Sequence, residues 1–449
     1  MRRFFALTST TTAFLIVPLM FAPSQSGAQA EEQLEPLNYV PGQVLVGLRS
    51  GAAKSPKTFV YSQIGAKTLE VIHTRAMQDA GHPPMELLQV SVPIEQAIKA
   101  LSQEPWVEYA EPNWIYRTCD TNDPYYTNGQ LWGMYGDSTS QVNQFGSQAG
   151  EAWRKFTGSH DVVIGVIDQG IDVNHLDLKA NIWVNPDEIV NGIDDDGNGY
   201  VDDIHGWDFV NNDPTVYDGG TLDRHGTHVA GTIGAVGGNG IGVAGVNWKV
   251  TMVSLKFLGS SGGTTANAVK AVDYLTNLKT SKGLRVIASN NSWGGGGFST
   301  SLSNAIARAN NAGIFFVAAA GNGGSDGIGD NNDVTAHYPS NYTHANVIAV
   351  ASITSSGAKS GFSNYGATTV DLGAPGSGIF STLPGNSYGS LSGTSMATPH
   401  VTGALALIAA KNERITMSKL RDKLFNTTIP TSSMTGRCVT GGRLNVGTR

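Results

Sequence analysis

The chain has 449 residues, a formal net charge of −7 at pH 7 and a hydrophobic content of 40%. This length allows more than one domain with a sizeable core, and the hydrophobic content is ordinary for a globular protein. The negative charge argues against a nucleic-acid partner. The sequence contains no block of like charges, so no charged tail is predicted.

The first thirty residues differ in composition from the rest of the chain. Arg2 and Arg3 precede a polar run and an apolar stretch at residues 13–22, and Ala28-Gln29-Ala30 offers small residues at a cleavage spacing. This order is typical of a secretory signal peptide over residues 1–30. The alternative, a membrane anchor, needs about twenty apolar residues. We therefore expect a secreted, extracellular protein without a membrane anchor.

Residues 38–117 have a pattern that they do not share with the segments after them. Apolar runs at residues 44–48 and 86–92 predict two strands. Residues 94–102 place apolar side chains at positions i, i+3, i+4 and i+7, which predicts an amphipathic helix. A last apolar run at residues 107–112 ends the unit. The pattern predicts a small α+β domain.

From about residue 160 the chain alternates short apolar runs with helical stretches. The runs lie at residues 162–167, 250–258, 285–288, 314–320 and 347–351. The helical stretches lie at residues 265–281, 301–312 and 396–410. Continuous apolar strands separated by helices predict a mainly parallel sheet that helices cover on both faces. We expect an α/β domain over residues 119–449, present as a monomer.

Three side chains in this domain carry the chemistry of a nucleophilic enzyme. Asp168 follows the strand at residues 162–167, at the sheet edge where open α/β folds place their sites. Ser395 precedes a helix whose N-terminus offers unpaired N–H donors. A serine hydroxyl becomes a nucleophile when a histidine, here His225, takes its proton and a carboxylate fixes the histidine tautomer. The chain order Asp, His, Ser matches one known arrangement.

The segments around these residues resemble the three active-site signatures of the subtilisin-like serine proteases. They read Val-Ile-Asp-Gln-Gly-Ile at residues 166–171, His-Gly-Thr-His-Val-Ala-Gly at 225–231 and Gly-Thr-Ser-Met-Ala-Thr-Pro-His at 393–400. The resemblance covers residues 120–449 and implies a three-layer subtilisin-like fold. It also implies a serine endopeptidase that works through an acyl-enzyme intermediate. Gln169 departs from the signature, where Thr or Ser is usual.

Other interpretations of these residues are weaker. A non-catalytic protein with a degenerate protease fold would lack one of the signature residues, and none is missing. An esterase would show Gly-x-Ser-x-Gly and the order Ser, Asp, His, which the surroundings of Ser395 do not. His225 and His228 form an H-x-x-H pair, but without a third ligand nearby this is a weak zinc signal.

The resemblance implies further residues for catalysis and for binding of polypeptide substrates. Asn322, in the segment at residues 318–323, would stabilise the oxyanion together with the Ser395 N–H; the alternative is an asparagine in a glycine-rich turn. The substrate would pair as an added strand with residues 291–295. The residues expected to contact the substrate are Ser292, Trp293, Gly294, Ala320 and Gly321.

His337 falls where the floor of the family's substrate pocket often has a small residue. We expect His337 to narrow or polarise that pocket. The alternative is a histidine that faces solvent in a loop.

Residues 194–203 predict a calcium site. Counted from the first aspartate, positions 1, 3 and 5 are Asp, Asp and Asn, and position 6 is Gly, as in calcium loops of the EF-hand type. Position 12 is His205 rather than Glu, so the loop is not an EF-hand. The expected ligands are Asp194, Asp196, Asn198, Tyr200 and Asp203. The alternative is an acidic surface turn.

The resemblance alone implies a second calcium site, with oxygen ligands from Asp123, Asp177 and Asn239. It also implies that residues 31–118 are an inhibitory propeptide. Its signatures are the strands at residues 39–46 and 107–113, and its tail at residues 116–121 would be cut by the enzyme itself. The alternative is an independent binding domain.

The two cysteines of the chain are Cys119 and Cys438. In an exported protein they would form one disulfide. The alternative is a pair of unpaired thiols.

Overall fold

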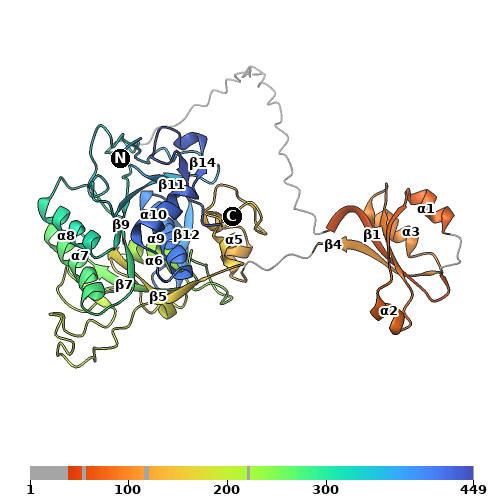
Figure 1. Ribbon diagram of the computed structural model, residues 1–449, viewed down its shortest axis with the longest axis horizontal. Coiled ribbons are helices and arrows are strands. Elements are labelled where there is room, and N and C mark those ends of the chain that lie inside the picture. The colour runs from red at the N-terminus through yellow and green to blue at the C-terminus, as the bar shows by residue number, and fades with distance from the viewer. Residues whose placement is uncertain (1–38, 53–56, 116–120, 220–222, 448–449) are drawn as a thin grey trace, which may run out of the picture. The chain divides into compact units, whose positions relative to one another are not determined.

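The computed structural model describes residues 39–52, 57–115, 121–219 and 223–447 (Figure 1). The chain divides into two compact units, Met1–Tyr116 and Arg117–Arg449. The predicted signal peptide, residues 1–30, lies outside the described residues. No helix in the described part is long and apolar enough to cross a membrane.

The first unit is a four-stranded antiparallel sheet with strand order β2-β3-β1-β4. Its strands are β1 (Tyr39–Leu48), β2 (Lys67–Ile72), β3 (Met85–Gln89) and β4 (Val107–Trp114). Its helices are α1 (Thr58–Ile64), α2 (Arg75–Asp79) and α3 (Ile94–Leu101). Val44, Val46 and Leu88 form one core with the buried sides of α1 and α3. The predicted small α+β domain is confirmed.

The opposite face of this sheet carries apolar side chains interspersed with acidic ones, since Glu111 is the register partner of Leu45 and Glu70 that of Leu87. Leu45 pairs with Leu87, and Gly47 lies between Met85 and Tyr109. The Tyr109 ring lies over Gly47, where a Cβ would stand 2.2 Å from the ring, and Tyr109 is 42% exposed. Within the described residues Tyr109 is therefore partly exposed on this face.

The second unit is built on a nine-stranded sheet with strand order β14-β15-β11-β10-β9-β8-β5-β7-β6. All neighbouring strands are parallel except β14 and β15. The strands are β5 (Gly158–Asp168), β6 (Gly206–Asp208), β7 (Lys249–Lys256), β8 (Val286–Asn291), β9 (Phe315–Ala319), β10 (Val347–Ile353), β11 (Leu372–Pro375), β14 (Ile429–Pro430) and β15 (Gly442–Arg443). A separate hairpin joins β12 (Ile379–Leu383) and β13 (Ser387–Leu391).

Helices cover both faces of this sheet, which explains its continuous apolar strands. Along β5, Val162, Ile164 and Val166 face a core that includes α6 (Arg224–Gly234) and α9 (Thr394–Lys411). Val163 and Ile167 face the other core, with α7 (Thr265–Thr280) and α8 (Thr300–Asn311). Successive strand residues point to opposite faces, so both sets must be apolar. The predicted three-layer α/β fold is confirmed.

Shorter helices complete the unit. They are α4 (Pro124–Thr127), α5 (Ala149–Trp153) and α10 (Met417–Asn426). The strands that matter for the site end on one edge of the sheet: β5 ends at Asp168, β7 at Lys256, and β8 leads into Ser292.

Candidate active site

The structure brings Asp168 and His225 into direct contact. Asp168 is fully buried at the end of β5, and its Oδ1 lies 2.8 Å from His225 Nδ1. His225 is the second residue of α6, whose backbone comes close to the segment after Asp168. A Cβ on Gly226 would stand 2.2 Å from the carbonyl oxygen of Gly170, so only glycine allows this approach.

The contact with Asp168 changes the basicity of His225. Burial lowers the pKa of His225, but the charge of Asp168 and the hydrogen bond that His225 donates to it outweigh burial, so the pKa is raised above 6.5. Asp168 Oδ1 also accepts from Gln169 N at 2.7 Å, whereas Oδ2 makes no hydrogen bond with any described residue. The Gln169 side chain accepts from His225 N at 3.3 Å. This geometry favours a histidine that accepts a proton and is stabilised once charged.

Ser395 lies at the neighbouring strand end. Its hydroxyl donates to the carbonyl oxygen of Ser292 at 3.0 Å. Val166 and Asn290 are register partners on β5 and β8, so Ser292 stands level with Asp168 on the adjacent strand. Adjacent strands lie about 5 Å apart. In this structure the Ser395 hydroxyl is thus hydrogen-bonded to Ser292 beside the Asp168–His225 pair.

Asn322 and the backbone of Ser395 supply two donors to one space. Asn322 Oδ1 accepts from Thr394 N at 2.8 Å and Thr394 Oγ1 at 3.0 Å, which leaves the amide nitrogen on the other side. A Cβ on Gly393 would stand 3.6 Å from both Asn322 Nδ2 and Ser395 N. Glycine therefore keeps open a space that both N–H groups flank.

The expected pocket residues occupy two different environments. The His337 ring lies between two glycines: a Cβ on Gly294 would be 2.3 Å from His337 Cε1, and one on Gly321 would be 3.0 Å from Cδ2. Burial lowers the pKa of His337, so the ring is neutral at pH 7. Ala320, in contrast, is fully buried in a small apolar cluster with Ala351 and Met434.

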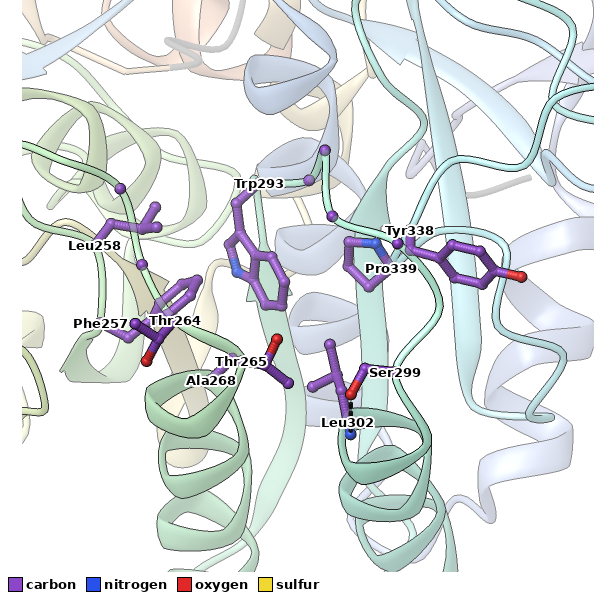
Figure 2. A pocket seen from close by; sticks show the side chains of 16 residues that line it. Phe257, Leu258, Thr264, Thr265, Ala268, Trp293, Ser299, Leu302, Tyr338 and Pro339 are labelled. Carbon is purple, nitrogen blue, oxygen red and sulfur yellow. Dashed lines mark hydrogen bonds between the residues drawn. The ribbon is translucent and has the colours of Figure 1, made fainter.

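Trp293 forms one wall of a pocket of about 370 Å³ that opens between the N-terminal ends of α7 and α8 (Figure 2). Figure 2 shows the Trp293 ring standing between Phe257 and Pro339. The ring centroids of Trp293 and Phe257 are 4.7 Å apart. The other labelled lining residues are Leu258, Thr264, Thr265, Ala268, Ser299, Leu302 and Tyr338. Sequence reasoning missed this pocket because its walls come from four separate segments.

The acidic loop gathers a partly different ligand set from the expected one. Oxygen atoms of Glu188, Asp196 and Asp203 lie within 4.8 Å of one another. Asn198 is adjacent, since its Nδ2 donates to Asp203 Oδ2 at 2.8 Å. Asp194 instead accepts from the backbone N–H groups of residues 198 and 199. Glu188 lies outside the spacing pattern that predicted the site.

The negative charge of Glu188, Asp196 and Asp203 is balanced only in part by neighbouring groups. Asp203 is fully buried, and burial raises its pKa. Burial also raises the pKa of Asp196, but hydrogen bonds from Asn185 and Lys282 outweigh it, so that the net shift is downward. Lys282 Nζ lies 3.0 Å from Asp196 Oδ2. The Tyr200 ring packs against Trp207 and Tyr274.

The three residues of the second expected calcium site also meet. Asn239 Nδ2 donates to Asp177 Oδ1 at 2.7 Å, and Asn239 N donates to Asp123 Oδ1 at 3.2 Å. Both carboxylates are fully buried, and burial raises the pKa of Asp177 to about 6. Among the described residues, no lysine, arginine or histidine forms an ion pair with either carboxylate. The two carboxylates are oxygen ligands of the kind that calcium takes, whereas the Asn239 side chain directs its Nδ2 at Asp177 and its Oδ1 accepts from Ile241 N.

The predicted disulfide stays a prediction. Cys119 lies outside the described residues. Cys438 is buried, and its Sγ lies 3.7 Å from the carbonyl oxygen of Gly442 and 3.8 Å from that of Met434.

Comparisons with known proteins agree with this geometry. Residues 159–444 match the subtilase family, and residues 25–113 match the fervidolysin N-terminal prodomain. A thermophilic serine proteinase from Bacillus sp. (strain AK1) is 33% identical over 423 residues, which is 91% of each chain. An extracellular protease from Xanthomonas campestris is 38% identical and covers 70% of this chain and 54% of its own length.

Among solved structures, a protease from Pseudoalteromonas arctica matches with a TM-score of 0.56 and 31% identity. The match covers 73% of this chain and 98% of that one. The chain therefore belongs to the subtilase family of serine proteases and carries an N-terminal prodomain ahead of its protease domain.

Proposed function

We propose that the chain is a secreted serine endopeptidase that uses Asp168, His225 and Ser395 as its catalytic triad. The observation that carries the proposal is the 2.8 Å contact between His225 Nδ1 and Asp168 Oδ1 at the sheet edge beside Ser395. In this arrangement Asp168 accepts a hydrogen bond from the Nδ1–H group, so the neutral ring keeps its proton on Nδ1 and Nε2 is the basic atom. The enzyme acts as a monomer.

The proposed reaction has two halves. His225 Nε2 takes the Ser395 proton as the oxygen attacks the peptide carbonyl, and the oxyanion accepts hydrogen bonds from Ser395 N and Asn322 Nδ2. The intermediate collapses when His225 gives the proton to the leaving amine, which yields the acyl-enzyme. A water molecule, activated by the same histidine, then releases the acyl group.

Polypeptide substrates would bind as an added strand along Ser292, Trp293 and Gly294. Backbone pairing of this kind gives affinity with little demand on sequence. The side chain next to the cleaved bond would enter the space between Gly294 and Gly321, where the His337 ring lies. His337 would therefore narrow the pocket for that side chain.

Residues 1–30 would direct export, and residues 31–118 would act as the inhibitory propeptide of the protease domain at residues 119–449. The match of residues 25–113 to the fervidolysin N-terminal prodomain supports this role. Removal of the propeptide would occur within residues 116–121, by the enzyme itself. The name of the Xanthomonas relative supports an extracellular location.

Calcium would bind at two sites, and at each it would hold together the chain segments that supply its ligands. One site would use Asp123, Asp177 and Asn239, whose buried carboxylates lack a described cationic partner. The other would use Asp196, Asp203 and Glu188, with Asp194, Asn198 and Tyr200 supporting the loop. In both, a bound cation would offset the cost of burying carboxylates. The role of calcium would be structural, and no catalytic step passes through it.

The proposal is tested with the full chain and its Ser395→Ala variant. We expect the wild-type chain to lose residues 31 to 118 and to digest casein. We expect the Ser395→Ala variant to remain full-length and inactive. If Ser395→Ala matures by itself as the wild type does, self-processing is refuted; if it also digests casein, the catalytic assignment fails.

A further inference from the structure

A buried lysine lies at the same sheet edge and has no part in the proposed chemistry. Lys256 ends β7 and is 2% exposed. Its ammonium group contacts Asp223 Oδ1 and lies 2.8 Å from Asp218 Oδ2. Burial lowers the pKa of Lys256, but the two carboxylates raise it above its ordinary value. Lys256, Asp218 and Asp223 form what we call the buried ion cluster.

Stability alone does not explain such a cluster. Taking charges out of water is costly, and apolar side chains of similar volume are often equally good or better for stability. Buried ion groups are retained in some proteins because they fix one particular arrangement. The position of the cluster in the fold therefore indicates which arrangement it fixes.

The buried ion cluster joins the strand that carries Asp168 to the helix that carries His225. Asp168 and Lys256 are register partners at the ends of β5 and β7. Asp223 immediately precedes α6, and its carbonyl oxygen accepts the first helical hydrogen bond, from Thr227 N at 3.1 Å. His225 follows two residues later. Any displacement of Asp223 would thus be passed to the first turn of α6.

The carboxylate of Asp223 is held from two sides. Its Oδ1 meets Lys256, and its Oδ2 accepts from Asp218 N at 2.7 Å and Gly219 N at 2.9 Å. The segment after Asp168 also rests on the cluster: a Cβ on Gly170 would stand 3.0 Å from Asp223 Oδ1 and 3.2 Å from Lys256 Cδ. Both partners of the Asp168–His225 contact are therefore attached to the same charged group.

We propose that Lys256 is a positioning residue of this enzyme. By holding Asp223 it fixes where α6 begins, and so sets the distance between His225 and Asp168. The proposal rests on the proposed function of Asp168, His225 and Ser395. Lys256 itself touches neither substrate nor the reacting atoms.

The test uses one disruptive variant, one neutral variant and a control. Lys256→Met leaves Asp223 buried without its partner, which is expected to destabilise the fold. The double variant Lys256→Met with Asp223→Asn removes the two fully buried charges, leaves the partly exposed Asp218 carboxylate, and keeps an amide oxygen for the N–H groups of residues 218 and 219. The control, Arg308→Met, breaks the exposed 2.6 Å ion pair with Asp273 between α8 and α7.

All variants are expressed as full chains and matured with a trace of affinity-tagged wild-type enzyme, which is then removed. This step keeps slow self-processing from lowering the measured rates. Folding is judged from the Tm and the near-UV circular dichroism spectrum.

We expect the double variant to fold and to lose about 10- to 100-fold in kcat, the loss that a misplaced catalytic group causes. KM for a soluble peptide substrate should change by less than about threefold, because the substrate strand is untouched. Labelling of Ser395 by a fluorophosphonate should slow by the same factor as kcat. Arg308→Met should match the wild type in every assay.

A pH profile separates positioning from simple loss of folded enzyme. Asp168 on β5 raises the pKa of His225, and His228 on the same helix is the other titrating ring nearby. The double substitution removes one charge of each sign, so its direct electrostatic effect is small. A longer His225–Asp168 contact should therefore move the acid limb of kcat/KM to lower pH.

A folded double variant with wild-type kcat and labelling rate overturns the proposal. A loss of kcat without a shift of the acid limb overturns it as well. The Ser395→Ala variant distinguishes failure of the proposed triad from failure of the Lys256 proposal. Labelling or activity in that variant rejects the proposed triad. Complete inactivity there, beside wild-type rates in the double variant, rejects only the role of Lys256.

Discussion

At the scale of single residues, Asn322 shows how a side chain is oriented by the bonds it already makes. Thr394 holds its amide oxygen through two hydrogen bonds, so the nitrogen must face the space that it shares with Ser395 N. We expect Asn322→Ala to lower kcat by about 10²–10³-fold, the range for loss of one such donor in a subtilisin. Steady-state kinetics on a peptide substrate should show little change in KM.

The Asn322→Asp variant is a matched comparison. It keeps acceptors for Thr394 but replaces the donor with a carboxylate oxygen, so it should be at least as slow as Asn322→Ala. A wild-type kcat in either variant would contradict a role for this amide.

His337 gives a second prediction at this scale. Because its ring lies against Gly294 and Gly321, we expect His337→Gly to open the pocket for larger side chains. The ratio of kcat/KM for phenylalanine over alanine next to the cleaved bond should rise by about tenfold. His344→Gly is the control, because the His344 ring is hydrogen-bonded to Ser303 on α8 at 2.8 Å. An unchanged preference in His337→Gly would show that this ring does not limit the pocket.

The sequence predicted those site residues that lie within a distinctive local motif. Asp168, His225 and Ser395 each lie in a segment with a distinctive pattern, so the sequence could point to them. Glu188 and Lys256 do not lie in segments with a distinctive pattern, so the sequence did not point to them. Only the folded structure places Glu188 beside Asp203.

At the scale of elements, α9 buries a histidine that must remain neutral. His400 is fully buried, its Nδ1 donates to the carbonyl oxygen of Met396 at 2.9 Å, and burial lowers its pKa to about 4. Between that pKa and 6.5, the ordinary value, the unfolded chain holds a proton that the folded chain lacks. Falling pH in this window therefore favours unfolding.

We expect His400→Gln, whose amide can donate to Met396, to lower the midpoint pH of acid unfolding. The measurement is intrinsic fluorescence during acid titration, with Ser395→Ala as the background to prevent self-digestion. His73→Gln, at an exposed position of the first unit, should leave the midpoint unchanged. A midpoint that stays the same or rises in His400→Gln would count against this source of acid sensitivity.

The long elements were predictable and the short ones were not. The runs that predicted β5 and β7 are continuous apolar stretches of strand length, and those that predicted α7 and α9 extend over several helical turns, so their length made them recognisable. Strands β14 and β15 have two residues each. They are strands only because a neighbouring strand supplies their hydrogen bonds, and no local sequence pattern predicts this pairing.

At the scale of the whole molecule, the proposed calcium sites join distant segments. Asp123 and Asn239 are 116 residues apart in the sequence. An ion that binds only the folded chain stabilises it in proportion to the logarithm of its concentration over Kd. We expect EDTA to lower the Tm of the Ser395→Ala chain by roughly 5–10 °C, from the usual relation between stability and Tm at this size.

Two variants assign this effect to its sites. Asp177→Asn should reduce the response to EDTA if the first site is responsible, and Asp203→Asn should do so for the acidic loop. A Tm that does not respond to EDTA in the parent chain would exclude structural calcium at both.

The order of the strands has a consequence for how the enzyme comes into being. Central strand β5 lies between β7 and β8, and α9, which begins with Thr394 and Ser395, packs against β5, β8 and β10. During synthesis Ser395, the proposed nucleophile, leaves the ribosome after most strands of the sheet, and α9 has no surface to pack against until those strands have paired. Contacts over such separations form slowly. If Ser395 is the nucleophile, as proposed, a nascent chain cannot cleave peptide bonds before α9 has packed, so the topology itself would delay proteolysis.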